Sequence, residues 1–522
     1  MNKTEYKFGA NILENLTTGM YQDSKIIYRE YIQNSCDSID KAVEIGLLPD
    51  ISAGMITIWL DSDTRTICIE DNGTGIPSDK FQDTLGDVAD SDKKIGENKG
   101  FRGIGRLCGL AYCKEVVFSS SVKGENIISH MRCDAQKMRS LLTASASGSK
   151  LSASDVLLAV NEFSVENTTD TKAHFFRVEL KDVNIENTEL LSENEIRDCL
   201  SFVAPVPYKS RFIFSSEIYK YVNEHGIRLD EYIIKLEGKQ IFKEFSTRLH
   251  KADGKSYDEI FDIAFKNFYD DSGNLFAWMW VGLSAFKGAI PKSNLMRGLR
   301  LRKENIQVGN EDALQKLFKE DRGNSYFVGE VFAVSNELVP NSQRDYFNEN
   351  LARATFERVL RKFFSDELHK IYNDGSTINS AQRKISTYEN KVAEFAEKDN
   401  KNAFVSDAHR ETELQKIEDA QKKAEQARKN IEKVKEKTDK NPESLTSKAI
   451  NIIVSNNQLP VSQKPLPSLP ESTKVRPRVC NLPQFSRSER KLISEIFDLI
   501  LSATDSKTAE LIITKIEDGL AE

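Results

Sequence analysis

Apolar side chains recur at helical spacing in one early segment of the chain. Between Ile26 and Val43, apolar or small residues return at every third or fourth position, with polar residues between them. This period predicts an amphipathic helix. The run 55–71 then alternates between apolar and polar residues on either side of a turn-forming segment at 61–64. It predicts two short strands that end in a glycine-rich loop.

More strand-like runs follow at 115–121, 126–133 and 175–180. A sheet built from such strands must bury its apolar face against another layer, and the helical segment can supply that layer. We therefore expect an α+β sandwich over residues 1–200. The next segment, residues 201–350, again mixes strand-like and helical runs, which predicts a second α+β domain.

The third part of the chain has a different pattern. Beyond a helical stretch at 353–372, the segment 381–440 is almost free of glycine and proline and rich in Glu, Lys, Ala and Gln. We expect a helical arm or coiled coil over residues 351–440. The residues near heptad spacing are Leu414, Ile417, Ala424, Ala427, Ile431 and Val434. This thin, alanine-rich seam fits a helix packed on its own protein as well as an intermolecular coil.

Prolines cluster between residues 441 and 486, and X–Pro pairs favour extended backbone, so this segment predicts a linker or a surface loop. Two amphipathic helices are expected at 487–502 and 507–520, which together form a C-terminal hairpin over 487–522. The apolar faces of such a short hairpin need a cover. Two alternatives remain: these faces pack against the body of the same chain, or they pack against a partner subunit.

Composition narrows the class of protein. The chain has 522 residues, of which 39% are hydrophobic and 29% charged, as is typical of a folded protein with several domains. It has no apolar run of about 18 residues and no apolar signal-peptide core, so we expect a cytoplasmic protein without membrane contact. The seven scattered cysteines fit reduced structural thiols. A net charge of −7 makes nucleic acid a disfavoured partner.

The candidate chemistry begins on the first predicted helix. Glu30, Asn34 and Asp37 stand at i, i+4 and i+7, so they share one face. An amide oxygen such as that of Asn34 can bind a hard metal ion, and a carboxylate such as that of Glu30 can take a proton from an attacking water. Alone, the three residues would equally fit the polar face of an ordinary helix.

Two glycine-rich segments follow in sequence order. Asp71 ends a predicted strand just before Gly73 and Gly75, and its carboxylate can accept a hydrogen bond from the exocyclic amine of adenine while the glycines allow close approach of the base. The segment 100–105, with glycines at 100, 103 and 105, then runs into an apolar helical pattern. Its backbone amides can point at phosphate groups. Each segment is weak evidence alone, but the ordered set favours a nucleotide site.

This ordered set resembles the GHKL superfamily, and the ninety-kilodalton heat-shock chaperones are the most similar members. The resemblance implies a Bergerat-type ATP-binding sandwich in which Glu30 is the general base, Asn34 the Mg²⁺ ligand and Asp37 a neighbour of the nucleotide. It makes Asp71 the adenine-reading aspartate, with the base against the glycine loop. The remaining residues that it implies for nucleotide binding are Gly73, Gly75, Gly100, Arg102, Gly103, Ile104 and Gly105.

The family carries its ATP lid between these segments, at about 81–99 in this chain. The lid has Asp90 where the chaperones commonly carry a lysine near the nucleotide, and Lys93 or Lys94 is expected to substitute. The family's Gly-Thr pair before the last strand is replaced here by the run 174–183, which lacks it. The runs 297–308 and 328–350 resemble the transducer-like middle domain of the chaperones. This part of the resemblance implies that Arg344 reaches the γ-phosphate of ATP.

These expectations combine into a function. The resemblance implies an Mg²⁺-dependent ATPase whose slow hydrolysis drives a clamp-like cycle on a protein client, with a homodimer through the C-terminal helices as one arrangement. A MutL-like or microrchidia-like nucleic-acid clamp or defence component is the first alternative, and salt-dependent DNA binding would favour it. A nonhydrolysing ATP-sensing scaffold is the second, and it would tolerate loss of Glu30.

Overall fold

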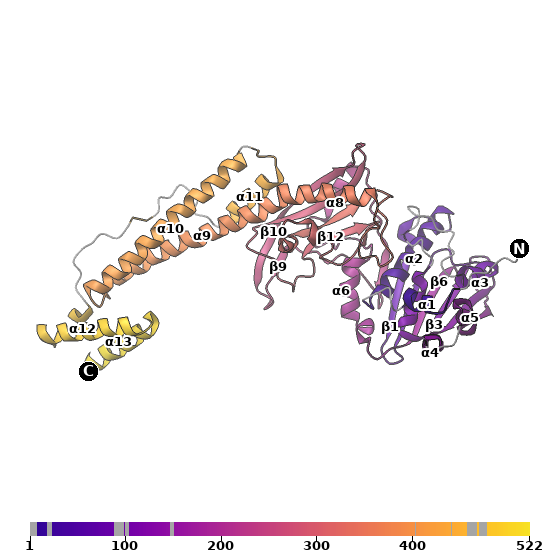
Figure 1. The fold of residues 1–522 in the computed structure, drawn as a ribbon, viewed down its shortest axis with the longest axis horizontal. Helices are drawn as coiled ribbons and strands as arrows, with labels where there is room; N and C mark the ends of the chain where they lie inside the picture. Colours follow the sequence, from indigo (N-terminus) through magenta and orange to yellow (C-terminus); the bar gives the residue numbers. More distant parts are fainter. Residues whose placement is uncertain are drawn as a thin grey trace. The chain divides into compact units, whose positions relative to one another are not determined.

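The computed structural model describes residues 8–17, 23–87, 99, 104–146, 151–401, 403–439, 441–456, 467–468 and 478–521. The chain divides into two compact units (Figure 1). Unit 1 comprises residues 1–283 and 289–366, and unit 2 comprises residues 284–288 and 367–522. Helices and strands are mixed in unit 1, whereas the described part of unit 2 is helical, so the expected α+β class is confirmed.

The first sheet of unit 1 has eight strands and contains the strands predicted around the glycine loop. Strands β1 and β2 form the expected antiparallel hairpin, with Ile58 opposite Ile69. The sheet extends past residue 200, because β7 pairs in parallel with β1. In spatial order the strands are β5 Asn161–Asn167, β4 Ile127–Asp134, β3 Cys113–Ser121, β6 Phe175–Val183, β2 Thr66–Asp71, β1 Met55–Asp61, β7 Ile233–Leu236 and β8 Lys239–Gln240.

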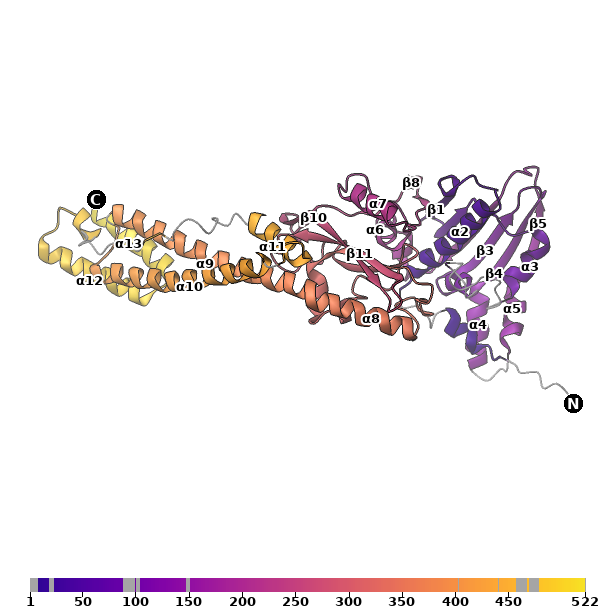
Figure 2. The same ribbon diagram turned by 90° about the horizontal axis from the view of Figure 1, so that it is seen from above.

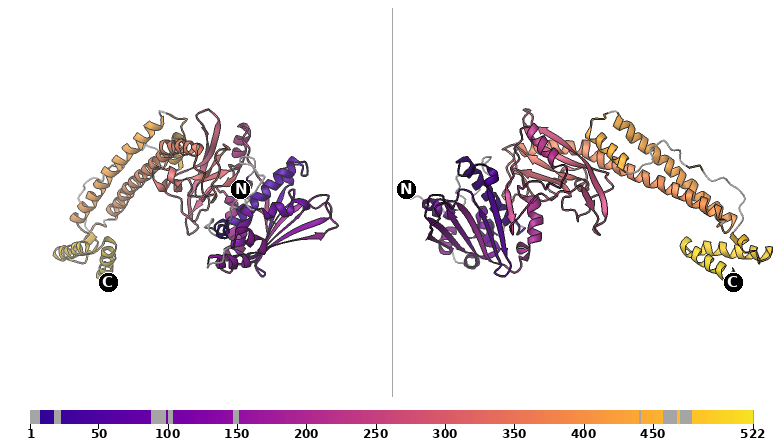
Figure 3. Two further views of the ribbon diagram at one scale, coloured as in Figure 1. Left: turned by 45° about the vertical axis from the view of Figure 1, so that its right-hand side comes forward. Right: turned by 180° about the vertical axis from the view of Figure 1, so that it is seen from behind.

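Helices pack on this sheet and close its core (Figure 3). Helix α2 contacts β1 and β2, and its apolar residues Ile27, Ile32 and Ile39 are buried in the core. The helices of this part are α1 Asn11–Thr17, α2 Ile26–Glu44, α3 Ser78–Gly86, α4 Ala135–Ala146, α5 Ala153–Val160 and α6 Glu193–Val203, with 3₁₀ turns η1 Ile51–Ala53, η2 Gly105–Ala111 and η3 Thr188–Leu191. Helix α7, Ser215–Glu224, instead buries Ile218 and Val222 in the core of the second sheet. The α2 bounds confirm the predicted amphipathic helix.

The second sheet of unit 1 has six strands and an aromatic core that includes Trp278, Trp280 and Phe245. Helix α8, Leu351–Phe363, follows the last strand. In spatial order the strands are β13 Ile306–Gln307, β12 Gly298–Lys303, β14 Val328–Ala333, β11 Leu275–Ser284, β10 Ser256–Tyr269 and β9 Arg248–His250, with 3₁₀ turns η4 Gln315–Leu317 and η5 Asp321–Tyr326. The strand candidates at 276–284 and 297–308 are therefore confirmed.

A buried polar cluster links the second sheet to Lys243, which follows the first sheet in the sequence. The carboxylate of Glu330 lies 3.1 Å from Lys243 Nζ and pairs with Arg302. Burial opposes ionisation of Glu330, but the charges of Arg302 and Lys243 hold its pKa down at about 2. Arg302 also donates to the carbonyl of Phe202 at 2.6 Å, at the end of α6. The cluster thereby fixes the two sheets of unit 1 against each other.

Unit 2 is built on a helical hairpin (Figure 2). A short π-helical segment, η6 Phe364–Leu368, leads into α9 His369–Asn400, which packs along α10 Asp407–Asp439. The predicted seam is intramolecular: Ile417, Ala424 and Ala427 are buried against α9 residues such as Tyr388. The alternative of a helix packed on its own protein is therefore the one that unit 2 adopts.

The proline-rich segment contains a helix that the sequence pattern did not predict. Helix α11, Leu445–Asn456, falls between Pro442 and Pro460, and its Ile450 and Ile453 are buried. Because no proline interrupts these twelve residues, they can form regular helix hydrogen bonds. After η7, Arg478–Asn481, helices α12 Arg487–Ala503 and α13 Ser506–Ala521 match the two predicted C-terminal helices. They share a small core that includes Phe497 and Ile513.

Candidate active site

The face of α2 that carries Glu30, Asn34 and Asp37 lies next to the glycine segments. The opposite apolar face of the helix anchors it in the first core, which leaves this polar face at the edge of the domain. Glu30 and Asp37 are buried and Asn34 is half-buried. Buried carboxylates are costly unless they have partners, so their placement here is a specific feature of the site.

The partner of Glu30 is the arginine that the sequence singles out from a distant segment. Arg344 Nε lies 2.6 Å from Glu30 Oε1, and both side chains are almost completely shielded from solvent. The pair is an ion pair by distance, but Oε1 receives no hydrogen bond of good geometry from a described residue. The two groups expected to act on the same phosphoryl group are thus neighbours.

A tight loop presents Arg344. Its backbone adopts a left-handed conformation with φ of 54°, which is uncommon for a residue other than glycine. The backbone carbonyl of Arg344 accepts a hydrogen bond from Gly309 N at 2.8 Å. The backbone N–H of Arg344 donates to Asn341 O at 3.1 Å. Asp345, the acidic residue next to Arg344 in the sequence, instead accepts a hydrogen bond from Asn341 Nδ2 at 2.6 Å. The loop therefore holds Arg344 toward α2 and away from its neighbour in sequence.

Gly105 leaves room for the carboxylate of Glu30. A Cβ atom built on Gly105 would lie 2.4 Å from Glu30 Oε2, which is closer than real side chains approach. The turn that starts here, η2, is also tied to α2, because Tyr31 OH donates to Arg106 O at 3.1 Å and accepts from Gly109 N at 3.2 Å. The absence of a side chain at Gly105 is what allows the carboxylate of Glu30 to lie against this turn.

Asp71 lies fully buried at the end of β2. Its Oδ1 accepts a hydrogen bond from Gly73 N at 2.9 Å. Burial raises the pKa of Asp71 to about 7, although hydrogen bonds from Gly73, Ser35 and Ser38 oppose the shift. Burial at the end of β2 therefore favours the neutral form of the Asp71 side chain over the charged carboxylate.

The two glycines after Asp71 are packed against neighbouring segments. A Cβ on Gly73 would meet Ser38 Oγ at 2.1 Å, and one on Gly75 would meet Ser121 O at 2.2 Å. Gly75 also has a positive φ of 66°. Both positions therefore need glycine to fold, so their conformation alone does not prove a ligand-binding role.

Several residues of the site carry no recognisable signal in the sequence. His174 precedes β6, and its Nδ1 lies 2.8 Å from the carbonyl of Gly73, near the place where the family's Gly-Thr pair is missing. Lys99 N donates to Asp37 Oδ1 at 2.7 Å, and Lys99 Nζ lies 2.6 Å from Asp40 and 3.3 Å from Asp230. Although burial opposes the charge, these two carboxylates raise the pKa of Lys99.

The remaining candidates divide into two groups. Ile104 is buried and immediately precedes η2. Lys93, its alternative Lys94, Gly100, Arg102 and Gly103 lie outside the described residues, as does most of the expected lid. The structure therefore brings together Glu30, Asn34, Asp37, Gly105 and Arg344, with Asp71 and its glycines at the neighbouring strand end.

Part of the N-terminal region is similar to a known family of proteins. Residues 23–154 match the family of histidine kinase-, DNA gyrase B- and HSP90-like ATPases. This match includes α2, Asp71 and the described part of the last glycine segment. The N-terminal region matches the GHKL ATPase family. Arg344 lies outside the matched residues.

Curated relatives of this GHKL region are chaperone proteins HtpG. The one from Fusobacterium nucleatum is 34% identical over 103 residues, which are 18% of this chain and 17% of the relative. The one from Bacillus subtilis is 33% identical over 97 residues, 17% of this chain and 16% of the relative. The chain thus aligns with less than a fifth of the length of these relatives. In the part of the chain that is described, no helix has the length and apolar character needed to cross a membrane.

The polar groups of the GHKL region suit a magnesium nucleotide. A buried carboxylate oxygen of Glu30 lacks a well-formed hydrogen bond, and the turn beside it is free of a side chain at Gly105. No group of three or more His, Cys, Asp or Glu side chains converges on a metal position among the described residues. A Mg²⁺ ion that is held largely by phosphate oxygens and waters needs only one or two protein ligands, and Asn34 can supply one.

The Asp71 carboxylate of the GHKL region yields a prediction about stability. Its folded pKa of about 7 lies above the ordinary value of about 3.9, so the folded state binds the proton more tightly than the unfolded state. Ionisation therefore destabilises the fold, and this cost grows as the pH rises from about 4 to about 7. Asparagine keeps an acceptor oxygen but never ionises. We expect the Asp71→Asn variant to melt about 5 °C above wild type at pH 8 and close to wild type at pH 4.5.

Differential scanning fluorimetry across this pH range measures the effect. Asp63→Asn, at an exposed position in the β1–β2 turn, serves as the control and should leave the melting temperature unchanged at every pH. A difference between Asp71→Asn and wild type that does not grow with pH would contradict the raised pKa of the buried Asp71 carboxyl group.

Proposed function

We propose that this chain is an Mg²⁺-dependent ATPase of the heat-shock-chaperone-like GHKL class. The observation that carries the proposal is the 2.6 Å approach of Arg344 to Glu30 from a segment far along the chain. A base and a cation that meet beside a glycine-lined turn are the groups that phosphoryl transfer to water needs. The turn at Gly105, which has no side chain, lies directly beside the Glu30 carboxylate.

The residues divide the chemistry between them. Glu30 takes a proton from the attacking water. At the same time the water oxygen forms a bond to the γ-phosphorus, and the bond between the γ-phosphorus and the bridging oxygen breaks, which releases ADP. Arg344 stabilises the negative charge on the transferred phosphoryl group. Arg344 is paired with Glu30 in the structure. ATP must therefore attract the guanidinium toward the γ-phosphate before Glu30 can act as a base. Hydrolysis would then depend on the position of the Arg344 loop.

The other residues bind and orient the nucleotide. Asp71 would accept a hydrogen bond from the exocyclic amine of adenine, and Gly73 and Gly75 would leave room for the ring. Asn34 would hold Mg²⁺, which when bound neutralises part of the phosphate charge. Asp37 fixes the backbone of Lys99 at the end of the lid segment, through the 2.7 Å hydrogen bond described above. The lid and its lysine remain predictions from the resemblance.

We further propose that slow turnover drives a clamp-like cycle in a dimer that acts on a protein client. The relatives' name, chaperone protein, supports this use of ATP. The rate is expected to be limited by conformational exchange, because Arg344 must leave Glu30 before the chemical step. The client is expected to meet the chain in the cytoplasm.

The C-terminal hairpin is the proposed dimer contact. Leu492, Ile496 and Leu499 are 58%, 42% and 68% exposed, and their i, i+4, i+7 spacing places them on one face of α12. Leu511 of α13 is also 60% exposed. An apolar stripe of this kind on a short hairpin is usually covered, and a second copy of the same hairpin offers a matching stripe.

Charge placed on this stripe should therefore separate the subunits. We expect the Ile496→Glu/Leu499→Glu variant to have half the mass of wild type when both are measured by light scattering after size-exclusion chromatography. Lys491→Glu/Lys507→Glu, at exposed polar positions of α12 and α13, is the matched control and should keep the wild-type mass. A monomeric wild type would refute the dimer while leaving the ATPase proposal intact.

Binding calorimetry with ATP and Mg²⁺ tests the nucleotide site itself. We expect wild type to bind ATP and the Asp71→Asn variant to lose at least tenfold in affinity, since a buried bond to a charged acceptor contributes about 1.5–3 kcal/mol. Asp63→Asn should bind as wild type does. If wild type binds no adenine nucleotide, the proposed function fails; if Asp71→Asn binds equally well, the assignment of the adenine contact fails.

A further inference from the structure

The helical hairpin of unit 2 contains a basic groove between α9 and α10. Its volume is about 380 Å³. Five of its lining residues are basic and one is acidic: Arg383, Lys384, Lys391, Lys416, Lys423 and Asp419. The two helices together contain as many acidic as basic side chains, so the excess of positive charge is local to this groove. Below, the term basic groove means the space between α9 and α10 that is lined by Arg383, Lys384, Lys391, Lys416 and Lys423.

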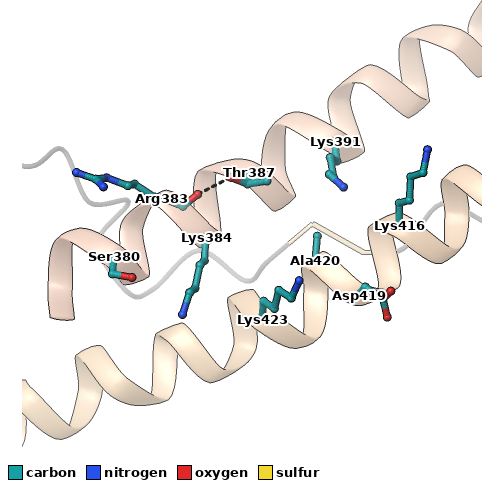
Figure 4. Close-up of a pocket in the computed structure, with 9 residues that line it drawn as sticks. All are labelled: Ser380, Arg383, Lys384, Thr387, Lys391, Lys416, Asp419, Ala420 and Lys423. Carbon is teal, nitrogen blue, oxygen red and sulfur yellow. Dashed lines mark hydrogen bonds between the residues drawn. The ribbon is translucent and has the colours of Figure 1, made fainter. Parts of the chain in front are cut away.

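The charges of the basic groove are largely uncompensated. Lys416 pairs with Glu413 at 2.8 Å, which is the one ion pair of the groove within the described chain. Arg383, Lys384 and Lys423 are exposed, and Lys391 is half-buried. Figure 4 shows Lys384 and Lys423 extending from opposite helices into the space between them. Like charges that face each other in this way are stabilised by a bound anion.

The spacing of the lysines is regular. Lys384 and Lys391 are seven residues apart on α9, and Lys416 and Lys423 are seven apart on α10. On a helix this separation is two turns, or about 10.5 Å. Each pair therefore spans the rise of about three nucleotides along one strand of a duplex. Two such rows, one on each helix, present an elongated set of point charges.

The other lining residues indicate which anion fits. Ser380, Thr387 and Ala420 are small, and Thr387 Oγ1 already donates to the carbonyl of Arg383 at 2.7 Å. Among the described residues, the lining holds no aromatic ring on which a single-stranded base could stack. The described lining also has no large apolar side chain that could anchor a protein partner. Lysines without such anchors are suited to a repeated phosphate backbone.

We propose that the basic groove binds the phosphate backbone of a nucleic-acid duplex. The contact is independent of base sequence, because exposed lysines act as point charges and do not read base edges. The net charge of −7 concerns the whole chain and does not determine the field in this groove. This binding site is separate from the proposed ATP site and does not depend on it.

Fluorescence anisotropy with the full chain and a labelled 20-base-pair DNA duplex tests the proposal. With four to five phosphate contacts, we expect a slope of about −4 in log affinity against log salt, and about 250-fold weaker binding at 200 mM than at 50 mM salt. The Lys384→Glu/Lys391→Glu/Lys416→Glu/Lys423→Glu variant should lose at least a hundredfold in affinity at 50 mM salt. Circular dichroism should show wild-type helicity, because Glu and Lys have similar helix propensity.

A variant with the same change in net charge is the control. Lys422→Glu/Lys429→Glu/Lys433→Glu/Lys448→Glu alters four exposed lysines of α10 and α11 outside the groove and should bind the duplex within threefold of wild type. The proposal is overturned if the two variants lose affinity equally, or if wild type does not bind the duplex at 50 mM salt. It is also overturned if polyglutamate of equal charge displaces the duplex as well as unlabelled duplex does, because the groove would then suit an acidic protein.

Discussion

Replacing Glu30 by glutamine should abolish ATP hydrolysis and leave ATP binding intact. Glutamine has nearly the same shape as glutamate but cannot take a proton from water. Because general-base catalysis contributes about 10²–10⁴-fold, we expect kcat to fall by at least a hundredfold. The dissociation constant for ATP should change less than threefold, because Glu30 is not assigned to the adenine or metal contacts. Phosphate release and binding calorimetry measure the two quantities on the same preparation.

The matched control is the same substitution at an exposed carboxylate at the other end of the same helix. Glu44→Gln changes the last residue of α2, which is exposed and outside the proposed site. It should preserve most of the hydrolysis rate. Hydrolysis that survives in Glu30→Gln would remove the base from the mechanism and favour a scaffold that only senses ATP.

Loss of Arg344 should have an effect of similar size by a different route. An arginine that stabilises the transferring phosphoryl group contributes on the order of 10³–10⁵-fold to kcat in related chemistry, so Arg344→Ala should reduce kcat by about a thousandfold. The Michaelis constant should change much less, since the contact is made mainly in the transition state. Steady-state kinetics over a range of ATP concentrations separates these two parameters.

Arg344→Lys distinguishes charge from geometry. Lysine keeps the positive charge but cannot adopt the planar, bidentate geometry of a guanidinium, so partial activity of about a tenth to a hundredth is expected. Arg353→Ala, at the start of α8, removes an arginine that pairs with Glu357 at 3.1 Å and should leave kcat unchanged. An unchanged kcat in Arg344→Ala would mean that the contact with Glu30 only stabilises the fold.

Much of unit 1 follows from short-range patterns in the sequence. The 3.6-residue period predicts α2, and the alternation around 61–64 predicts β1 and β2, because each element buries one face in the first core. The strands β7 and β8 have too few residues to show a period. β7 joins the sheet by pairing with β1, and β8 by pairing with β7. Helix α11 lies in a segment whose composition favours extended backbone, and it forms because prolines flank it without interrupting it.

In the candidate site, too, local patterns predict some residues and miss others. Glu30, Asn34 and Asp37 could be predicted because a single helix determines their relative positions. The approach of Arg344 to Glu30 could be anticipated only from the family resemblance, because contacts between residues so far apart depend on the packing of two sheets. The contacts of Lys99 with Asp40 and Asp230, and of His174 with Gly73, had no sequence signal. Each depends on long-range contacts that local patterns do not encode.

A double-mutant cycle on phosphate release from MgATP tests the central claim most directly. Wild type, Glu30→Gln, Arg344→Ala and the double variant would be compared as full-length chains. If the two residues act on one phosphoryl group, wild type should release phosphate slowly, each single variant should lose that activity, and the double variant should be no slower than the slower single variant. Phosphate release by wild type at the same rate as by Glu30→Gln would contradict the proposed ATPase.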